Sequence, residues 1–169
     1  MMNRRGFAGV AAAIALGPAT LALAAAGAWQ SYRNDRFGYE VSYPAELLAP
    51  QPEAENGDGR HFQPRRGHVD VAVWAGYANG ETLAVAADEA EQNCAGAHAG
   101  YKVIRSAKRP PFMALSCTKP DGQVFYAKAM ACEDVLTQLQ FTYPAAEKAT
   151  WDPVVTKMAA SLGAACGSG

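Results

Sequence analysis

The 169-residue sequence lacks the motifs that identify a chemical reaction. It has no Gly-x-Ser-x-Gly nucleophile elbow and no phosphate-binding glycine loop. It also has no close histidine pair such as His-x3-His, so a zinc site would need His61, His68 and His98 to converge from distant positions. We therefore assign no catalytic residue, no cofactor and no metal from the sequence.

The calcium-loop pattern is incomplete as well. Asn56-Gly57-Asp58-Gly59 resembles part of such a loop, but that alignment places Ala54 at the first position and Arg65 at the twelfth. Both of these positions require a carboxylate. The segment is better interpreted as a turn that enters a hairpin.

Positive charge is scarce after the N-terminal segment. Of the 15 Lys and Arg residues, Arg4 and Arg5 lie within residues 1–28, which leaves 13 against 16 Asp and Glu and a formal net charge of −3. Nucleic-acid binding favours a concentrated positive field, so nucleic acid is excluded as a partner class. Heptads, internal repeats and low-complexity tracts are also missing, and the 141 residues that remain after residue 28 have the length of one domain, 29–166, with a disordered tail at 167–169.

Residues 1–28 have the features of an export signal. Arg4 and Arg5 precede an uncharged stretch that ends in Ala26-Gly27-Ala28, which predicts cleavage between Ala28 and Trp29. The alternative is a membrane anchor, but glycine, proline and alanine make the stretch weakly apolar for a spanning helix. A lipoprotein would need a cysteine just after the stretch, whereas the first cysteine is Cys94. We expect a periplasmic or secreted bacterial protein with no stable membrane anchor after signal removal.

The export route stays open between two alternatives. Asn3-Arg4-Arg5-Gly6-Phe7 partly matches the twin-arginine motif, which would imply export of the folded protein. The segment before the arginines is very short, and Ala8-Gly9 replace the usual following residues, which leaves ordinary export of the unfolded chain as the other route.

Four cysteines in an exported chain predict two disulfides, with three possible pairings: the cysteines are Cys94, Cys117, Cys132 and Cys166. Leu83, Ala87, Ala90 and Cys94 have the spacing of the buried stripe of a helix over about 81–95. Alternation predicts strands at 112–117, 124–131 and 135–143, with Cys117 on an inward face and Gln138, Gln140 and Thr142 on a face that is wet or thinly covered.

The last helix is expected to return along the sheet. Asp152 is a plausible N-cap with Pro153 at the first helical position, and the apolar stripe runs to Leu162. Strand 135–143 advances roughly 30 Å and a helical segment 145–162 roughly 27 Å in return. This geometry places Cys166 beside Cys132 and leaves Cys94 for Cys117.

Two further strands are expected upstream, at 37–43 and 69–74, the second in a hairpin with 59–63 across the turn 64–67. In the second, Asp70, Ala72 and Trp74 alternate with three valines. The order of strands, helix, strands and helix predicts an α+β fold with an antiparallel sheet.

The sequence resembles the PsbP-like family of small exported bacterial proteins. The resemblance spans nearly the whole domain and rests on short segments: Tyr32-x-Asn34-x-Arg36-Phe37-Gly38, Tyr43-Pro44, Asn56-Gly57-Asp58-Gly59, Phe125-Tyr126 and Tyr143-Pro144. It implies an α/β/α sandwich, shared with a photosystem extrinsic subunit and a Ran-binding import factor, whose members mostly bind or help to assemble other proteins. It implies no chemistry and transfers no binding residue.

Two candidate sites were weighed against structural roles. Cys94 and His98 lie four residues apart, as a thiol nucleophile and its base would. Cys94, however, is expected near a helix C-terminus, which disfavours a thiolate, so a structural disulfide is the preferred interpretation. The other candidate is the local basic cluster of the hairpin, which would bind an anionic surface or would be a solvated turn: Arg60, His61, Arg65, Arg66 and His68.

These observations favour an exported, non-catalytic binding or accessory protein of the bacterial cell envelope that acts through contacts with another envelope protein or complex. The alternative is an envelope hydrolase whose active site carries no recognisable motif.

Overall fold

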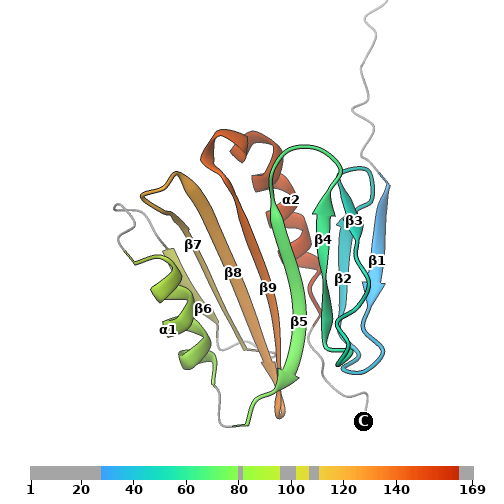
Figure 1. Cartoon of the computed structure of the whole chain (residues 1–169). Coiled ribbons are helices and arrows are strands. Elements are labelled where there is room, and N and C mark those ends of the chain that lie inside the picture. Colours follow the sequence, from blue (N-terminus) through green and yellow to red (C-terminus); the bar gives the residue numbers. More distant parts are fainter. Residues whose placement is uncertain (1–27, 80–81, 96–101, 107–110, 164–169) are drawn as a thin grey trace, which may run out of the picture.

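The computed structural model describes residues 28–79, 82–95, 102–106 and 111–163. A seven-stranded antiparallel sheet has the strand order β3-β4-β5-β9-β8-β7-β6, and β1 and β2 form a separate antiparallel pair. Helices α1 and α2 lie on opposite faces of the large sheet (Figure 1). The strands are β1 (Trp29–Arg33), β2 (Glu40–Pro44), β3 (Leu48–Pro50), β4 (Gly59–Pro64), β5 (Asp70–Tyr77), β6 (Lys102–Ser106), β7 (Phe112–Thr118), β8 (Gln123–Cys132) and β9 (Val135–Pro144). The helices are α1 (Leu83–Asn93), α2 (Lys148–Ser161) and the 3-10 turn η1 (Ala145–Glu147).

The larger core lies between the sheet and α2. Alternate residues of β5 and β9 face it, and β2 and α2 close it from the other side. Trp151 of α2 and Phe141 of β9 are fully buried there. Burying apolar surface at about 25 cal/mol per Å² makes this cluster the main source of stability.

The smaller core lies between α1 and strands β7 and β8. Ala86, Ala87 and Ala90 form the buried side of α1, and their small side chains let the helix approach the sheet closely. At the end of α1, Cys94 is bonded to Cys117 of β7. The predicted Cys94–Cys117 disulfide is therefore confirmed, together with the inward orientation of both residues.

The last helix begins earlier than expected. It starts at Lys148 after η1, so Pro153 lies inside the helix and Asp152 is not its N-cap. Asp152 instead accepts a hydrogen bond from the Tyr143 hydroxyl (2.7 Å), because the residue lies over the end of β9. The local Asp-Pro signal was therefore overridden by the continuous turn that leaves β9.

The first predicted strand is shorter than expected at its start. Residues 37–39 lie outside β2, because the buried Asn34 amide organises a turn before the strand. Its Oδ1 accepts from the Phe37 backbone N–H (2.8 Å), and its Nδ2 donates to the Gly57 carbonyl (3.0 Å). Strands β1, β3 and β6 were not predicted, since each has at most five residues and little alternation.

Some predictions fall on residues that the structure does not describe. Residues 1–27 of the signal segment 1–28, His98, Cys166 and the tail 167–169 lie outside the described residues. The pairing of Cys132 with Cys166 and cleavage at Ala28 therefore stay predictions. Within the described ranges, no helix combines the length and the apolar character needed to cross a membrane.

Candidate functional site: an uncovered sheet face

In the described part of the chain, no helix lies over one part of the α1 side of the large sheet. The helix α1 has 11 residues and lies on β7 and β8, whereas β9, β5 and β4 continue beyond it. We call the α1 side of these three strands the open face (Figure 1). By strand alternation, it is formed by His61, Asp70, Ala72, Trp74, Gln138, Gln140 and Thr142.

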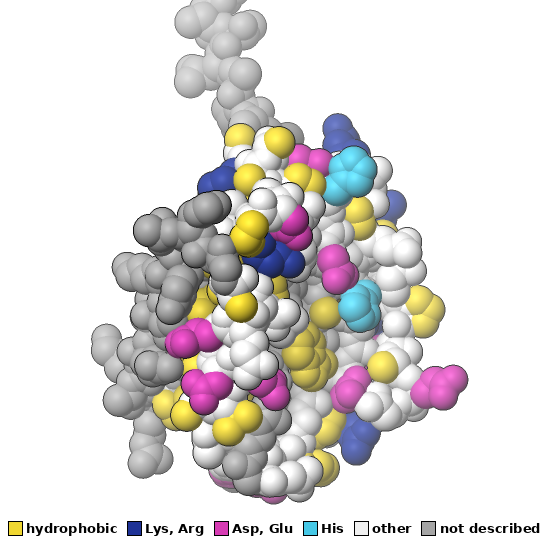
Figure 2. Space-filling model, turned by 60° about the vertical axis from the view of Figure 1, so that its left-hand side comes forward, with side chains coloured by type: hydrophobic (Ala, Val, Ile, Leu, Met, Phe, Trp, Pro, Cys, Tyr) yellow, Lys and Arg dark blue, Asp and Glu magenta, His cyan; other side chains and the backbone are white. Residues whose placement is uncertain are grey.

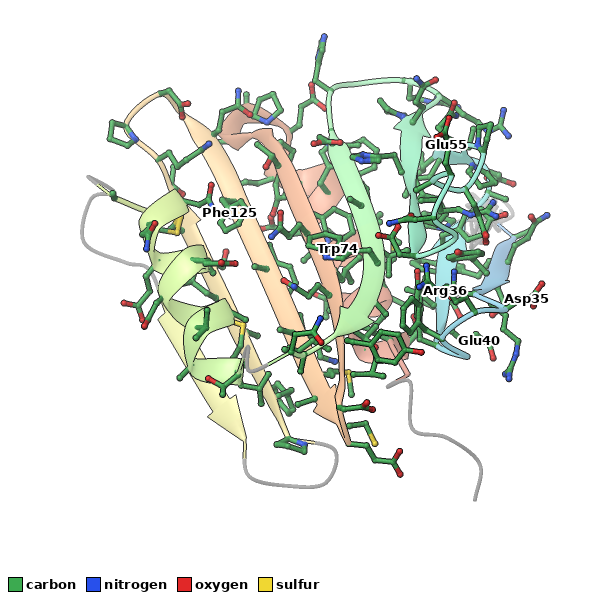
Figure 3. The ribbon with its side chains drawn as sticks, turned by 60° about the horizontal axis from the view of Figure 1, so that its bottom comes forward. Asp35, Arg36, Glu40, Glu55, Trp74 and Phe125 are labelled. Carbon is green, nitrogen blue, oxygen red and sulfur yellow. A yellow bond between two sulfur atoms is a disulfide. The ribbon has the colours of Figure 1, made fainter. Side chains whose placement is uncertain are left out.

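Trp74 is the only large aromatic residue among these seven. Its side chain is half-buried, and Figure 3 shows it on β5. The strand β9 separates β5 from β8, which carries Phe125. The register pairs Trp74 with Gln138 on one side and with Gly59 on the other. A Cβ atom at Gly59 would lie 2.1 Å from the Val73 carbonyl oxygen and 2.8 Å from the Trp74 Cβ. Glycine is therefore required beside Trp74 by close approach of the backbone.

Two shallow depressions meet on the open face. One, of about 280 Å³, lies between the 51–58 loop and the strands, and the other, of about 240 Å³, lies over β5 and β9. His61, Ala72 and Trp74 line both. Within this face, His61 Nδ1 lies 3.3 Å from Asp70 Oδ1, and both side chains are mainly exposed. Each depression is partly open to solvent, and each is smaller than about 300 Å³, the lower end of the usual range for small-molecule pockets.

Two segments beside the open face are rich in acidic residues. The 51–58 loop carries Glu53, Glu55 and Asp58, and α1 carries Asp88, Glu89 and Glu91, while neither segment contains a lysine or an arginine. Figure 2 shows Asp and Glu side chains on both sides of this hollowed face, with hydrophobic side chains exposed between them. Acidic side chains therefore lie beside a face on which polar side chains surround the Trp74 ring.

The predicted basic cluster is divided among different surroundings. Arg60 lies four residues before the end of β4, rather than at the hairpin tip, with its guanidinium 3.2 Å from Glu53 and 4.1 Å from the Tyr32 ring centroid. His61, the next residue, points to the open face. Arg65 donates from Nε to the Ala45 carbonyl (2.8 Å), and Arg66 is exposed. The cluster therefore presents no single basic surface.

His68 and the hairpin turn are attached to the start of α2. Glu147 accepts hydrogen bonds from the His68 backbone N–H (2.9 Å) and from Trp151 Nε1 (2.8 Å), and it lies 3.0 Å from His68 Nδ1. These donors, the His68 backbone N–H first, lower the pKa of Glu147 to about 2. His68 thus has a structural role in this arrangement.

The other shifted groups belong mainly to the α2 side of the sheet. Burial raises the pKa of Tyr39 and of Tyr143, and it raises the pKa of Tyr126 to about 12. Burial also lowers the pKa of Lys128, whose ammonium donates to the Ala159 carbonyl (2.6 Å) near the end of α2. Among the described residues, no group of three or more His, Cys, Asp and Glu side chains is placed to hold a metal ion.

Sequence reasoning did not select Trp74, although a signal was present. The alternation of β5 places a large aromatic residue on the same face as Asp70, where a wet face would carry polar side chains. Gln138 and Gln140 were correctly placed on the wet side of β9. The sequence did not show that Trp74 lies beside Gln138 and Gln140 on an adjacent strand.

No protein-family model and no curated protein matches this chain. The fold is similar to the solution structure of cyanobacterial PsbP (CyanoP) from Synechocystis sp. PCC 6803, with a TM-score of 0.60. The match has 14% sequence identity and covers 85% of this chain and 95% of that chain. The protein therefore has a PsbP-like α+β fold, as the sequence resemblance predicted.

Proposed function

We propose that this PsbP-like protein is an exported, non-catalytic accessory protein of the bacterial cell envelope, which binds another envelope protein through its open face. The observation that carries the proposal is the half-buried Trp74 on a sheet face that α1 leaves uncovered. Aromatic residues are enriched at protein interfaces, where they supply large contact area at low entropic cost.

Two features support the proposed location. The sequence of residues 1–28 is typical of an export signal, with paired arginines and a small-residue end. The Cys94–Cys117 disulfide supports an oxidising compartment, because such bonds are rare in reducing cytosol. The periplasm or the extracellular space provides those conditions.

A photo-crosslinking residue at Gln140 tests the proposal in living cells. Gln140 is half-buried on the open face, while the matched control position, Thr156, is exposed on α2 at the other side of the sheet. We expect a discrete crosslinked partner from Gln140 and none from Thr156, and the purified partner should bind the wild-type protein and bind the Trp74→Ala variant more weakly. Crosslinks from Thr156 alone would contradict the assigned face.

The hydrolase alternative has a separate test. His61 and Asp70 form the one titratable pair described within the open face. Hydrolysis of ester, amide or phosphate substrates by the purified protein, lost in His61→Gln, would contradict a non-catalytic role. We expect no difference between wild type and His61→Gln.

A further inference from the structure

Among the described residues of the open face and of the two segments beside it, carboxylates outnumber lysines and arginines. Asp70 lies on the face, Asp58 lines its larger depression, and further acidic residues border it from α1 and from the 51–58 loop. The guanidinium of Arg60 is engaged by Glu53 and lies over the Tyr32 ring. Its charge is therefore offset locally by Glu53.

The open face carries one large aromatic ring, that of Trp74. A guanidinium or ammonium group placed over an indole ring is attracted by the negative ring face, and Trp is the best of the aromatic residues for this contact. Beside Trp74, Gln138 and Gln140 supply amide donors and acceptors on the neighbouring strand. An arginine side chain would thus find an aromatic surface, carboxylates and hydrogen-bond partners within one face.

Other classes of ligand fit this surface less well. Anionic ligands such as nucleic acid or acidic lipid would be repelled by the carboxylates. A purely apolar segment would bury the charges of Asp58 and Asp70 without supplying a countercharge, which is costly. Charge complementarity therefore favours a cationic occupant.

We infer that the open face binds a positively charged segment of the partner protein, with an arginine or lysine side chain against the Trp74 indole and its neighbours paired with Asp58 and Asp70. The inference rests on the proposed function and adds the chemical class of the partner segment. It assigns Trp74 as the specificity-determining residue.

Peptides of matched design provide the test. Three short synthetic peptides carry arginine, glutamine or glutamate at alternate positions between the same alanine and serine residues. Binding is followed by the indole N–H resonance of Trp74 in NMR spectra, assigned by comparison with Trp74→Phe. We expect the arginine peptide alone to shift this resonance, with an affinity that falls as salt is raised, since exposed charge contacts are screened.

Paired variants separate a local effect from net charge. Asp58→Asn/Asp70→Asn removes two negative charges from the open face, and Asp35→Asn/Glu40→Gln removes two from the region of the β1–β2 pair, away from Trp74 (Figure 3). Two exposed ion pairs correspond to roughly a tenfold change in affinity. We expect that loss for the first variant and an unchanged affinity for the second.

Trp74 is tested with two replacements that retain bulk. Trp74→Leu should weaken binding of the arginine peptide several-fold, while Trp74→Phe should restore part of the affinity because it retains an aromatic face. Thermal unfolding of both Trp74 variants checks that the fold is intact. Because neither variant has the Trp74 indole, their affinity for the arginine peptide is measured from the backbone amide resonance of Gln140.

Each other outcome overturns the inference. These outcomes are equal binding of the three peptides, preference for the glutamate peptide, no binding of any peptide, equal weakening by both carboxylate variants, or self-association of the protein through this face. A crosslinked partner whose contact segment carries no Lys or Arg would leave the proposed function in place and overturn the inference. Failure of both crosslinking and peptide binding would overturn the two together.

Discussion

The position of Trp74 depends on a neighbouring residue that has no side chain. Gly59 lies opposite Trp74 in the β4–β5 register, and its missing Cβ allows the Val73 carbonyl and the Trp74 backbone to approach. Gly76 lies two residues after Trp74 on the same face of β5, yet a Cβ built there meets no atom within 4 Å. Close backbone contacts therefore require glycine at position 59, whereas position 76 has space for a Cβ atom.

Gly59→Ala should destabilise the protein, because backbone atoms would have to move. We expect a loss of about 1–3 kcal/mol in the free energy of unfolding, the usual range for overpacking. The matched variant Gly76→Ala should stay within about 0.5 kcal/mol of wild type. Urea unfolding measures both, and equal effects would contradict the close-approach argument.

Glu147 makes stability depend on pH in a defined window. The pKa of Glu147 is about 2 in the folded protein against the ordinary glutamate value of 4.5, so folding favours the ionised carboxylate. The associated stabilisation is complete above about pH 4.5 and is lost as the pH falls towards 2. As the pH falls through this window, we expect the unfolding temperature of Glu147→Gln to decrease less than that of the wild type.

Measurement of the unfolding temperature between neutral pH and pH 2 would check this prediction. His68→Ala is a useful comparison, because it removes the imidazole ring but retains the His68 backbone N–H, which lowers the pKa of Glu147 most. Its pH profile should lie between those of wild type and Glu147→Gln. Superimposable wild-type and Glu147→Gln profiles would show that the carboxylate does not have the assigned role.

Among the elements, α1 defines the site by its limited coverage. Its buried stripe consists of alanines, which keep it close to β7 and β8, and the bond from Cys94 to Cys117 fastens its end to β7. A helix on the neighbouring strands would have covered Trp74. The disulfide therefore stabilises the arrangement that leaves the open face accessible.

Replacement of this disulfide by Cys94→Ala/Cys117→Ala should reduce stability substantially. The two cysteines are separated by 23 residues, and closing a loop of that length corresponds to about 3 kcal/mol in the chain-entropy model. Denaturant unfolding of the oxidised wild type and the double variant measures this difference. A change below about 1 kcal/mol would indicate that the loop is already restricted in the unfolded chain.

For the molecule as a whole, the predicted export signal defines the residue at which the mature protein begins. We expect the exported protein to begin at Trp29, which opens β1, where its ring lies 4.1 Å from the Lys157 ammonium. Intact-mass analysis of the exported protein checks the cleavage site, and retention of residues 1–28 would contradict it. Cleavage at this point leaves the whole β1–β2 register in the mature protein.

The sequence was sufficient to predict an element wherever its local periodicity agrees with its burial in the structure. It gave the positions of α1, β5 and β7 to β9 within a few residues, the α+β class, and the Cys94–Cys117 pair, because each depends on alternation, helical spacing or the reach of an element. The short strands β1, β3 and β6 carry too few residues for a period to be recognised, and the early start of α2 depends on how the chain leaves β9.

Tertiary structure decided the site. Local sequence placed Arg60 and His68 in one basic cluster, but strand alternation sends Arg60 and His61 to opposite faces, and Glu147, 79 residues away along the chain, holds His68. Conversely, Trp74 and Gln138 become neighbours only through pairing of β5 with β9. Side-chain type and period are properties of a segment, whereas a surface is formed by strands that are distant in sequence and by the helix that leaves them uncovered.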